Sequence, residues 1–212
     1  MIFFEGMDMK SMRKGDLTYQ RALAHAAETF SLYGYAGTTM RELRRATGLK
    51  GGVYGHFESK EALALEAFDY AISQLQQRAL DALVGKETAY QRLQTLVDVF
   101  RRLIDEPLLP GGCPILNTAV EADDAYPELR ERAQRAMDTW HRRIHQIVVE
   151  GICSGQLLPD TDPIDVATIL TASLEGAIML SKLYGDASSM HRVVTFLTSY
   201  LKSLVSNEKS LS

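Results

Sequence analysis

The side chains best suited to chemistry in this sequence gather in one stretch, residues 38–60. Helical spacing leaves a set of hydroxyl, imidazole and cationic groups on its outer side: Thr39, Arg41, Lys50, Tyr54, His56 and Lys60. Hydroxyl, imidazole and ammonium groups donate hydrogen bonds to phosphate oxygens, which positions a protein on DNA without reading its sequence. Arg41 and Lys50 also have the reach for a guanine edge, whereas Gly51 and Gly52 offer no side chain. The stretch predicts contact with double-stranded DNA.

Two short helices joined by a tight turn would hold these side chains. Thr39 is a good N-cap, and Glu42 three residues later completes a capping box, so a helix begins at Thr39. Gly48 favours its end, because glycine adopts the left-handed conformation that helix C-termini often need. The next segment, Gly51–Phe57, has Val53 one turn before its last residue, which gives it an inner face. The pattern predicts a helix-turn-helix. A buried hairpin that binds nothing would explain the apolar positions but not the outward polar ones.

A family pattern is present in the same residues: Phe30, Gly34, Thr38-Thr39, Gly48 and the run Tyr54-Gly55-His56-Phe57-x-x-Lys60. This pattern resembles the DNA-binding domain of the TetR family of bacterial transcriptional regulators, over roughly the first third of the chain. The resemblance implies that Thr39, Tyr54, His56 and Lys60 contact the DNA backbone. It also implies that residues at the start of the second helix read bases.

Beyond this stretch the chain shows helical spacing and no strand pattern, so the predicted fold class is all-α. We expect a flexible arm at 1–15, a three-helix helix-turn-helix domain at 16–62, and a helical ligand-binding and dimerisation bundle at 63–212. The helices outside the helix-turn-helix are predicted at Asp16–Gly34, Ser59–Leu83, Ala89–Asp105, Cys113–Asp123, Tyr126–Gly151, Asp162–Tyr184 and Ser188–Val205. The resemblance assigns Ser59–Leu83 the role of a lever between the two domains.

The last two predicted helices carry more apolar surface than one core needs. Asp162–Tyr184 is apolar nearly all round and includes small residues such as Gly176, and the last helix has a second apolar face at Phe196 and Tyr200. A helix with two apolar faces needs two partners. Burial within one protomer is the alternative, but a homodimer is favoured because one helix-turn-helix reads only half of a palindromic site.

Cys113 is a candidate sensor. It lies between Gly112 and Pro114 at a predicted helix N-terminus, where the positive end of the helix dipole would stabilise a thiolate and raise its reactivity. A Gly-Cys here also resembles a branch of the family that senses electrophiles or oxidants. The alternative is a small buried residue, because free cysteine packs well. Cys153, near a helix end, is expected to be inert core.

If the family pattern holds, an effector cavity lies among the body helices. The residues that we expect around it are Phe100, Asn117, Tyr126, Met137, Trp140 and Glu175. Each is more often plain core, and the resemblance does not identify the ligand.

Other functional classes have little support. His141 and His145 have the spacing of a metal pair, but no third ligand accompanies them, so no metal or cofactor is expected. No phosphate loop or nucleophile motif is present, and catalysis is not predicted. Two distant cysteines do not indicate a disulfide framework. No signal-peptide core and no run of eighteen apolar residues is found, so we expect a cytoplasmic protein that does not contact a membrane.

Charge is distributed unevenly, as expected for a DNA binder with a separate control domain. Residues 1–60 carry nine Lys/Arg against six Asp/Glu, and residues 61–212 carry fourteen against twenty-one. The sequence therefore predicts a homodimeric repressor, released from a palindromic operator by a small molecule or by modification of Cys113. A helical small-molecule carrier without specific DNA recognition and a metal-dependent enzyme are the alternatives.

Overall fold

The protein is described here by a computed structural model that covers residues 14–47, 57–122 and 125–206. In these ranges the regular elements are helices, accompanied by an isolated antiparallel bridge between Leu157 and Val205, so the all-α prediction is confirmed. The helices are α1 (Lys14–Gly37), α2 (Met40–Thr47), α3 (Lys60–Leu83), α4 (Ala89–Asp105), α5 (Pro114–Ala122), α6 (Pro127–Cys153), α7 (Pro163–Tyr184) and α8 (Ser188–Ser203).

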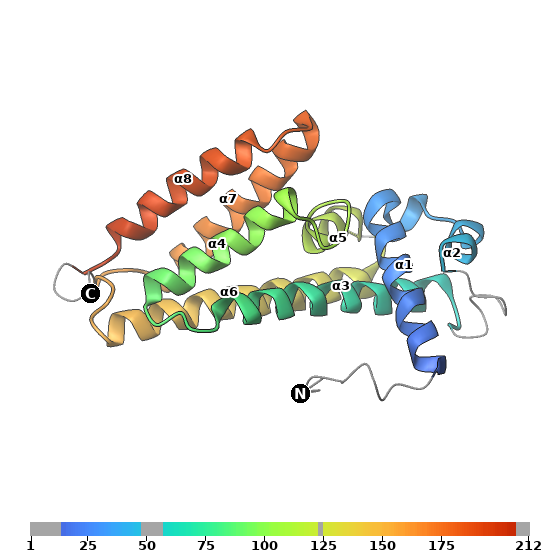
Figure 1. Ribbon diagram of the computed structural model, residues 1–212, viewed down its shortest axis with the longest axis horizontal. Coiled ribbons are helices and arrows are strands. Elements are labelled where there is room, and N and C mark those ends of the chain that lie inside the picture. Colours follow the sequence, from blue (N-terminus) through green and yellow to red (C-terminus); the bar gives the residue numbers. More distant parts are fainter. Residues whose placement is uncertain (1–13, 48–56, 123–124, 207–212) are drawn as a thin grey trace.

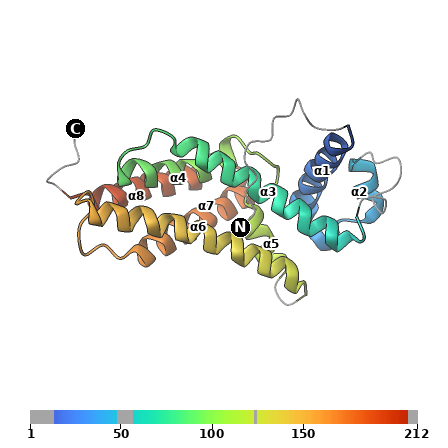
Figure 2. The ribbon, with the colours of Figure 1, turned by 90° about the horizontal axis from the view of Figure 1, so that it is seen from below.

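The molecule is elongated, with α1 and α2 at one end and α4, α7 and α8 toward the other (Figure 1). The long helices α3 and α6 run along the body and connect the two ends, as the perpendicular view also shows (Figure 2). Helix α5 lies between the two ends and contacts α1, α3 and α6. This position makes α5 and α3 the elements through which the two ends can affect each other.

Most helix boundaries agree with the sequence because local caps define them. The Ser59 hydroxyl accepts from the Ala62 N–H at the start of α3, and Thr88 forms a capping box with Gln91 before α4. The Asp162 carboxylate caps α7. Helix α8 begins at the predicted residue, Ser188. Its N-cap position is occupied by Ala187 without a side-chain hydrogen bond, and the Ser188 N–H and hydroxyl donate to Asp186.

Helix α3 joins three apolar clusters. Leu63 packs with α1 and α2 at the N-terminal end, and Ile72 and Leu75 belong to the large core of the body. Between them, Ala64 and Leu65 form a small cluster with residues of α5 and α6. A shift of α3 would therefore change packing at both ends, which agrees with its expected role as a lever.

Helix α7 is, among the described residues, the one helix long and apolar enough to cross a membrane by length and composition. This differs from the expectation that no segment of the sequence is long and apolar enough to span a membrane. Half of the apolar window is nevertheless buried inside the protein, where α7 packs against α6 and α8. It also contains the buried carboxyl group of Glu175. We interpret α7 as a core helix on these grounds.

Candidate DNA-binding and effector sites

The capping box that starts α2 is confirmed. The Thr39 hydroxyl accepts from the Glu42 N–H at 3.3 Å, and the Glu42 carboxylate accepts from the Thr39 N–H at 2.7 Å. A further hydrogen bond from the Thr39 hydroxyl lowers the pKa of the Glu42 carboxyl group, so this carboxylate stays ionised at neutral pH. Leu43, on the inner face of α2, has a fully buried side chain. The cap and this anchor fix the direction of the helix.

The exposed side of α2 is basic. Arg41, a predicted base-contacting residue, is exposed, and Arg44 and Arg45 are exposed beside it. Arg44 and Arg45 are not among the residues predicted to contact DNA, although their spacing of three and four residues from Arg41 puts all three on one side of the helix. Three guanidinium groups on one short helix give this end of the molecule an affinity for phosphate oxygens.

Lys60, another predicted DNA contact, is the first residue of α3. Its Nζ lies 4.3 Å from the centroid of the Tyr35 ring in a cation–π contact. The ring therefore holds the ammonium group near the junction of the two ends. The remaining predicted contacts, Lys50, Gly51, Gly52, Tyr54 and His56, lie outside the described residues.

Phe57 belongs to the apolar core of the N-terminal end. Its side chain is 3 % exposed and its ring stacks on Tyr19 at 5.2 Å between centroids. The Tyr19 hydroxyl donates to the Glu66 carboxylate on α3. Burial and this carboxylate raise the pKa of Tyr19 to about 12, so the hydroxyl stays protonated and remains a donor.

The kink in α1 is at Gly34, where the sequence predicts a helix end, although the helix continues to Gly37. Gly34 has φ 73° and ψ 169°, and a Cβ there would lie 2.7 Å from the Glu121 carboxylate. That carboxylate, on α5, accepts hydrogen bonds of 2.7 Å from the backbone N–H groups of Tyr35 and Ala36. Glu121 thus connects the kink to the body.

Cys113 occupies the predicted position immediately before α5 but not the predicted chemical state. Its side chain is fully buried, and its thiol donates to Glu175 Oε1 at 3.0 Å. Burial, reinforced by the Glu175 carboxylate, raises the pKa of the Cys113 thiol well above its ordinary value, and outweighs the backbone hydrogen bonds at the helix start that lower it. The expected stabilised thiolate is therefore wrong for this conformation. Cys153, expected in the core, is exposed at the end of α6.

Among the described residues, Glu175 is the only buried one with a charged side chain, and this side chain is 7 % exposed. Burial raises the pKa of its carboxyl group to about 7, and the hydrogen bond from Cys113 partly opposes that shift. Its second oxygen, Oε2, has no hydrogen-bond partner, and neither does the hydroxyl of Thr171 one turn earlier on α7. Glu175 and Thr171 therefore each provide one unsatisfied polar atom inside an apolar core.

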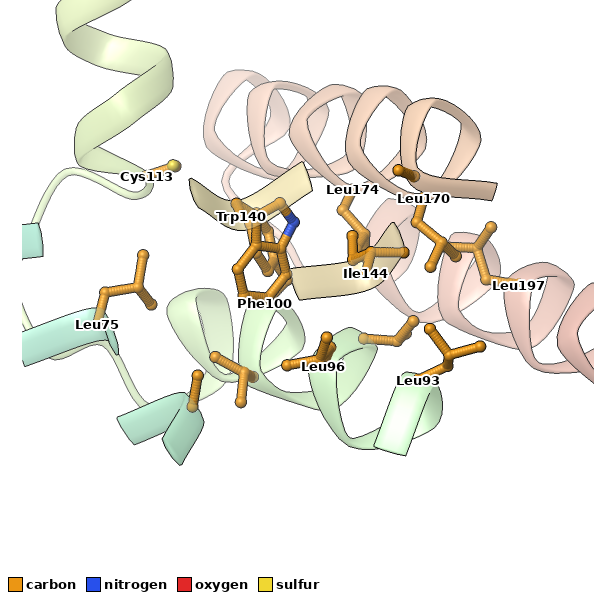
Figure 3. Packing of buried hydrophobic residues seen from close by; sticks show 14 of the residues in the cluster. Leu75, Leu93, Leu96, Phe100, Cys113, Trp140, Ile144, Leu170, Leu174 and Leu197 are labelled. Carbon is orange, nitrogen blue, oxygen red and sulfur yellow. The ribbon is translucent and has the colours of Figure 1, made fainter. Parts of the chain in front are cut away.

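Phe100 and Trp140 form an aromatic pair in that core, with ring centroids 4.7 Å apart (Figure 3). The Trp140 Nε1 donor is buried without a partner. A small cavity of about 30 Å³ borders Trp140 on the side of α3. Met137 is partly buried against the same cluster. Five of the predicted effector residues thus belong to one packed region of the body, namely Phe100, Cys113, Met137, Trp140 and Glu175.

Asn117 and Tyr126 lie elsewhere. They line a separate cavity of about 50 Å³ that α1, α3, α5 and α6 enclose. Asn117 donates to the Gly111 carbonyl at 2.8 Å and accepts from Lys182 at 3.3 Å. The predicted effector set is therefore divided between the body core and the junction of the two ends. His141 and His145 lie on α6, and no group of three or more metal-ligating side chains occurs in the described ranges.

Two family models match the chain. One, "Bacterial regulatory proteins, tetR family", matches residues 22–67, and the other, "Tetracyclin repressor-like, C-terminal domain", matches residues 89–197. The chain belongs to the TetR family. This TetR-family protein is a DNA-binding transcriptional regulator with the all-helical fold of the family, and it is not an enzyme. The family match favours the regulator over the carrier and over the metal-dependent enzyme.

Individual relatives agree with this assignment. A TetR transcriptional regulator from Chloroflexus aurantiacus is 42 % identical, with a TM-score of 0.87 over 92 % of this chain and 98 % of that one. The HTH-type transcriptional repressor DhaR of a Mycobacterium species is 27 % identical over 91 % of this chain and 95 % of its own length. The regulator CifR, solved with 26-base-pair operator DNA, shares the fold with a TM-score of 0.76 at 22 % identity, over 94 % of this chain and 100 % of that one.

The TetR-family chain exposes apolar side chains on its last two helices. On α7, Met179 and Leu183 are 53 % and 70 % exposed, and on α8 Phe196 is 64 % exposed. Gly176, on the same side of α7, has open space above it. The inner stripe of α8, with Met190, Leu197 and Leu201, is buried against the body. Phe196 is exposed as the sequence predicts, whereas Tyr200, predicted on the same outer face, is partly buried against the body core. Helices α7 and α8 therefore each expose apolar side chains.

Proposed function

We propose that this chain is a homodimeric repressor that binds a palindromic operator in the cytoplasm and is released by an effector acting on the body core. The effector is a small molecule that binds beside Glu175, or an electrophile that modifies Cys113 once the core opens. The expected domain boundaries at residues 15 and 62 are part of this proposal.

The observation that carries the proposal is the capped, basic helix α2 on the N-terminal fold of the family. The reciprocal Thr39–Glu42 bonds and the buried Leu43 set the helix direction, and Arg41 is exposed on it. The family resemblance implies that residues at the start of the second helix of the motif, predicted at Gly51–Phe57, read bases. Lys60, on the other side of that segment, supplies a further cation for the DNA backbone.

The exposed faces of α7 and α8 support a homodimer. A two-fold axis brings the same surface of both protomers together, so an apolar patch on two adjacent helices is self-complementary. Phe196, Met179 and Leu183 would be buried, and Gly176 would allow close approach of the backbones. A dimer positions two N-terminal ends for half-sites about 34 Å apart, one turn of DNA.

The unsatisfied polar atoms of the core support an effector site near Glu175. A buried polar atom without a partner costs about 1–3 kcal/mol, and Glu175 Oε2, Thr171 Oγ1, Ser181 Oγ and Trp140 Nε1 are all without one. A ligand that supplies these hydrogen bonds would regain part of that cost. Because burial keeps the Cys113 thiol protonated, we rank reversible binding ahead of covalent modification.

A short segment connects this core to α1. Cys113 bonds Glu175, the Gly111 carbonyl accepts from Lys182 at 2.5 Å, and the Pro110 carbonyl accepts from the Ser31 hydroxyl of α1. Four consecutive residues therefore run from the buried carboxylate to the N-terminal domain. An effector that moves Glu175 or Cys113 would shift the orientation of α1 and change the separation of the two DNA-reading ends.

The test is selection of DNA from a random pool by the purified chain, followed by affinity measurements for the winning sequence across salt concentrations. We expect an enriched palindrome with half-sites about one helical turn apart. Arg41→Ala should weaken binding to the selected site, and Arg135→Ala, at an exposed position on α6, should not. No enrichment, with weak binding that salt abolishes for every sequence, would refute specific recognition.

A further inference from the structure

Gly111 and Gly112 fit closely between two helices from different ends of the molecule. Both have a positive φ, 99° and 87°. A Cβ on Gly111 would lie 2.2 Å from the Ser31 carbonyl oxygen of α1, and a Cβ on Gly112 would lie 3.1 Å from Ile178 Cγ2 on α7. Gly111 thus has no space for a side chain, and Gly112 has little. A displacement of this glycine pair would press directly on the backbone of α1.

Side chains of α7 hold the glycine pair in place. Lys182 donates to the Gly111 carbonyl at 2.5 Å. Cys113, the residue after the pair, donates its thiol hydrogen to Glu175 Oε1 at 3.0 Å. Figure 3 shows Cys113 among the apolar side chains of the body core. The contact between α1 and the glycine pair therefore depends on the state of Glu175.

The surroundings of Glu175 suit a neutral carboxyl group better than an ionised one. Its side chain is 7 % exposed, its Oε2 has no partner, and the donor to Oε1 is a thiol, which is a weak donor. In the described ranges no cation forms an ion pair with Glu175, because Lys182, two turns later on α7, bonds the uncharged oxygens of Gly111 and Asn117. A buried charge without such partners is costly.

The helices packed against α7 carry charged groups with partners of their own. On α4, Arg101 pairs with Asp98, and on α8 His191 lies 3.4 Å from Asp105 of α4. On α6, the Nε2 atom of His141 is buried without a partner, so this side chain needs a control variant. Among the titratable groups of the described chain, the hydrogen-bonded thiol is the one that alters the pKa of the buried carboxyl group.

The proton equilibrium of Glu175 differs between a closed and an open core. Burial raises the pKa of its carboxyl group to about 7 in the closed core, whereas a solvated carboxyl group keeps its ordinary pKa of 4.5. An open conformation that admits water to Glu175 therefore becomes more favourable as pH rises between these values. Opening separates Glu175 from Cys113 and frees the glycine pair to move against α1.

We propose that Glu175 is a proton-binding regulatory site: when protonated it holds α1 in the orientation that binds the operator, and when ionised it releases that orientation. The ligand of this site is a proton, and the route to DNA is the glycine pair. The coupling rests on the proposed binding of an operator and adds a response to pH.

The expected loss of affinity has a defined pH range. It begins above about pH 4.5 and ends near pH 7, because above pH 7 the carboxyl group is ionised in both conformations. The shift of about 2.5 pH units permits at most an about 300-fold change in the ratio of open to closed conformations in each protomer.

The test is the affinity for the selected operator from pH 5 to 8.5 at constant salt, for the wild type and Glu175→Gln. Glutamine does not titrate, so the ratio of the two affinities removes the contribution of other titrating groups, such as any at the DNA contact. We expect this ratio, wild type over variant, to fall as pH rises to about 7 and to stay constant above it. His141→Gln and the exposed control Glu131→Gln should follow the wild type.

A constant ratio, or a pH profile that His141→Gln flattens and Glu175→Gln retains, would overturn the proton site. Specific binding that is equal for both proteins at every pH would leave the proposed DNA recognition intact and remove this coupling alone. Absence of specific binding by both proteins at every pH would overturn both.

Cys113→Ser is a second variant in case Glu175→Gln does not fold. The hydrogen bond from Cys113 lowers the pKa of Glu175, and a hydroxyl group is a stronger donor than a thiol. The fall in affinity should therefore end at a lower pH in Cys113→Ser than in the wild type, whereas Cys153→Ser, at the exposed cysteine, should not change it. No shift for Cys113→Ser, or a shift to higher pH, would overturn the assignment.

Discussion

Replacing Glu175 by glutamine should remove much of the pH dependence of stability near neutrality. The Glu175 side chain is 7 % exposed, and burial raises the pKa of its carboxyl group from 4.5 to about 7 in the folded protein. In the unfolded chain the carboxyl group is solvated and has its ordinary pKa. Between these two pH values the folded state binds a proton that the unfolded state releases.

The sign follows from this difference in bound protons. As pH rises from about 4.5 to about 7, the folded state loses stability relative to the unfolded one, and above pH 7 the loss is complete. The shift of about 2.5 pH units at about 1.4 kcal/mol per unit gives a loss on the order of 3 kcal/mol. Glu175→Gln is neutral at every pH, so it should match the wild type near pH 4.5 and exceed it by up to that amount at pH 8.

Urea unfolding of both proteins from pH 4.5 to 8, at one fixed protein concentration, measures this difference. Glu131→Gln is the matched control, because Glu131 is exposed on α6 and its removal should leave the pH profile unchanged. Parallel profiles for the wild type and Glu175→Gln would refute the assignment of a buried carboxyl group that titrates near neutrality.

Three further predictions concern the cap, the dimer and the thiols. Thr39→Ala should cost about 1 kcal/mol of stability through the lost cap and weaken operator binding, whereas Thr39→Ser should retain both, as urea unfolding and DNA titration would show. Phe196→Glu should give monomers in sedimentation velocity with unchanged helicity, while Tyr33→Glu, a ring with the same 64 % exposure on α1, should leave the dimer intact. A thiol reagent should label Cys153 quickly and Cys113 only after unfolding, and two fast thiols would contradict the burial of Cys113.

Much of the secondary structure was predictable because its signals are local. Ser59, Thr88 and Asp162 lie within three residues of the N–H groups that they cap, so the sequence contains both partners. The sequence also located the irregularity at Gly34, where glycine permits a positive φ, but as the end of the helix and not as a kink within it. That Glu121 holds the kink could not be foreseen, since 86 residues separate its carboxylate from the Tyr35 N–H.

The candidate effector site was predictable by residue type but not by position. Cys113 lies at a helix start as expected, yet its pKa depends on burial and on Glu175, which is 62 residues away. Asn117 lies on an expected helix and Tyr126 directly before one, but both side chains line the cavity at the junction of the two ends and not the body core. Helical periodicity identifies which residues share a face and does not identify the neighbour that the face meets.

The central claim is that two copies of this chain recognise one palindromic operator. The direct measurement is the mass of the complex with the selected operator, together with the affinity for a duplex in which one half-site is scrambled. Two chains of 23.6 kDa per operator, with a large loss of affinity on scrambling, is the predicted result. One chain per operator, or equal affinity for the intact and the half-scrambled duplex, would contradict it.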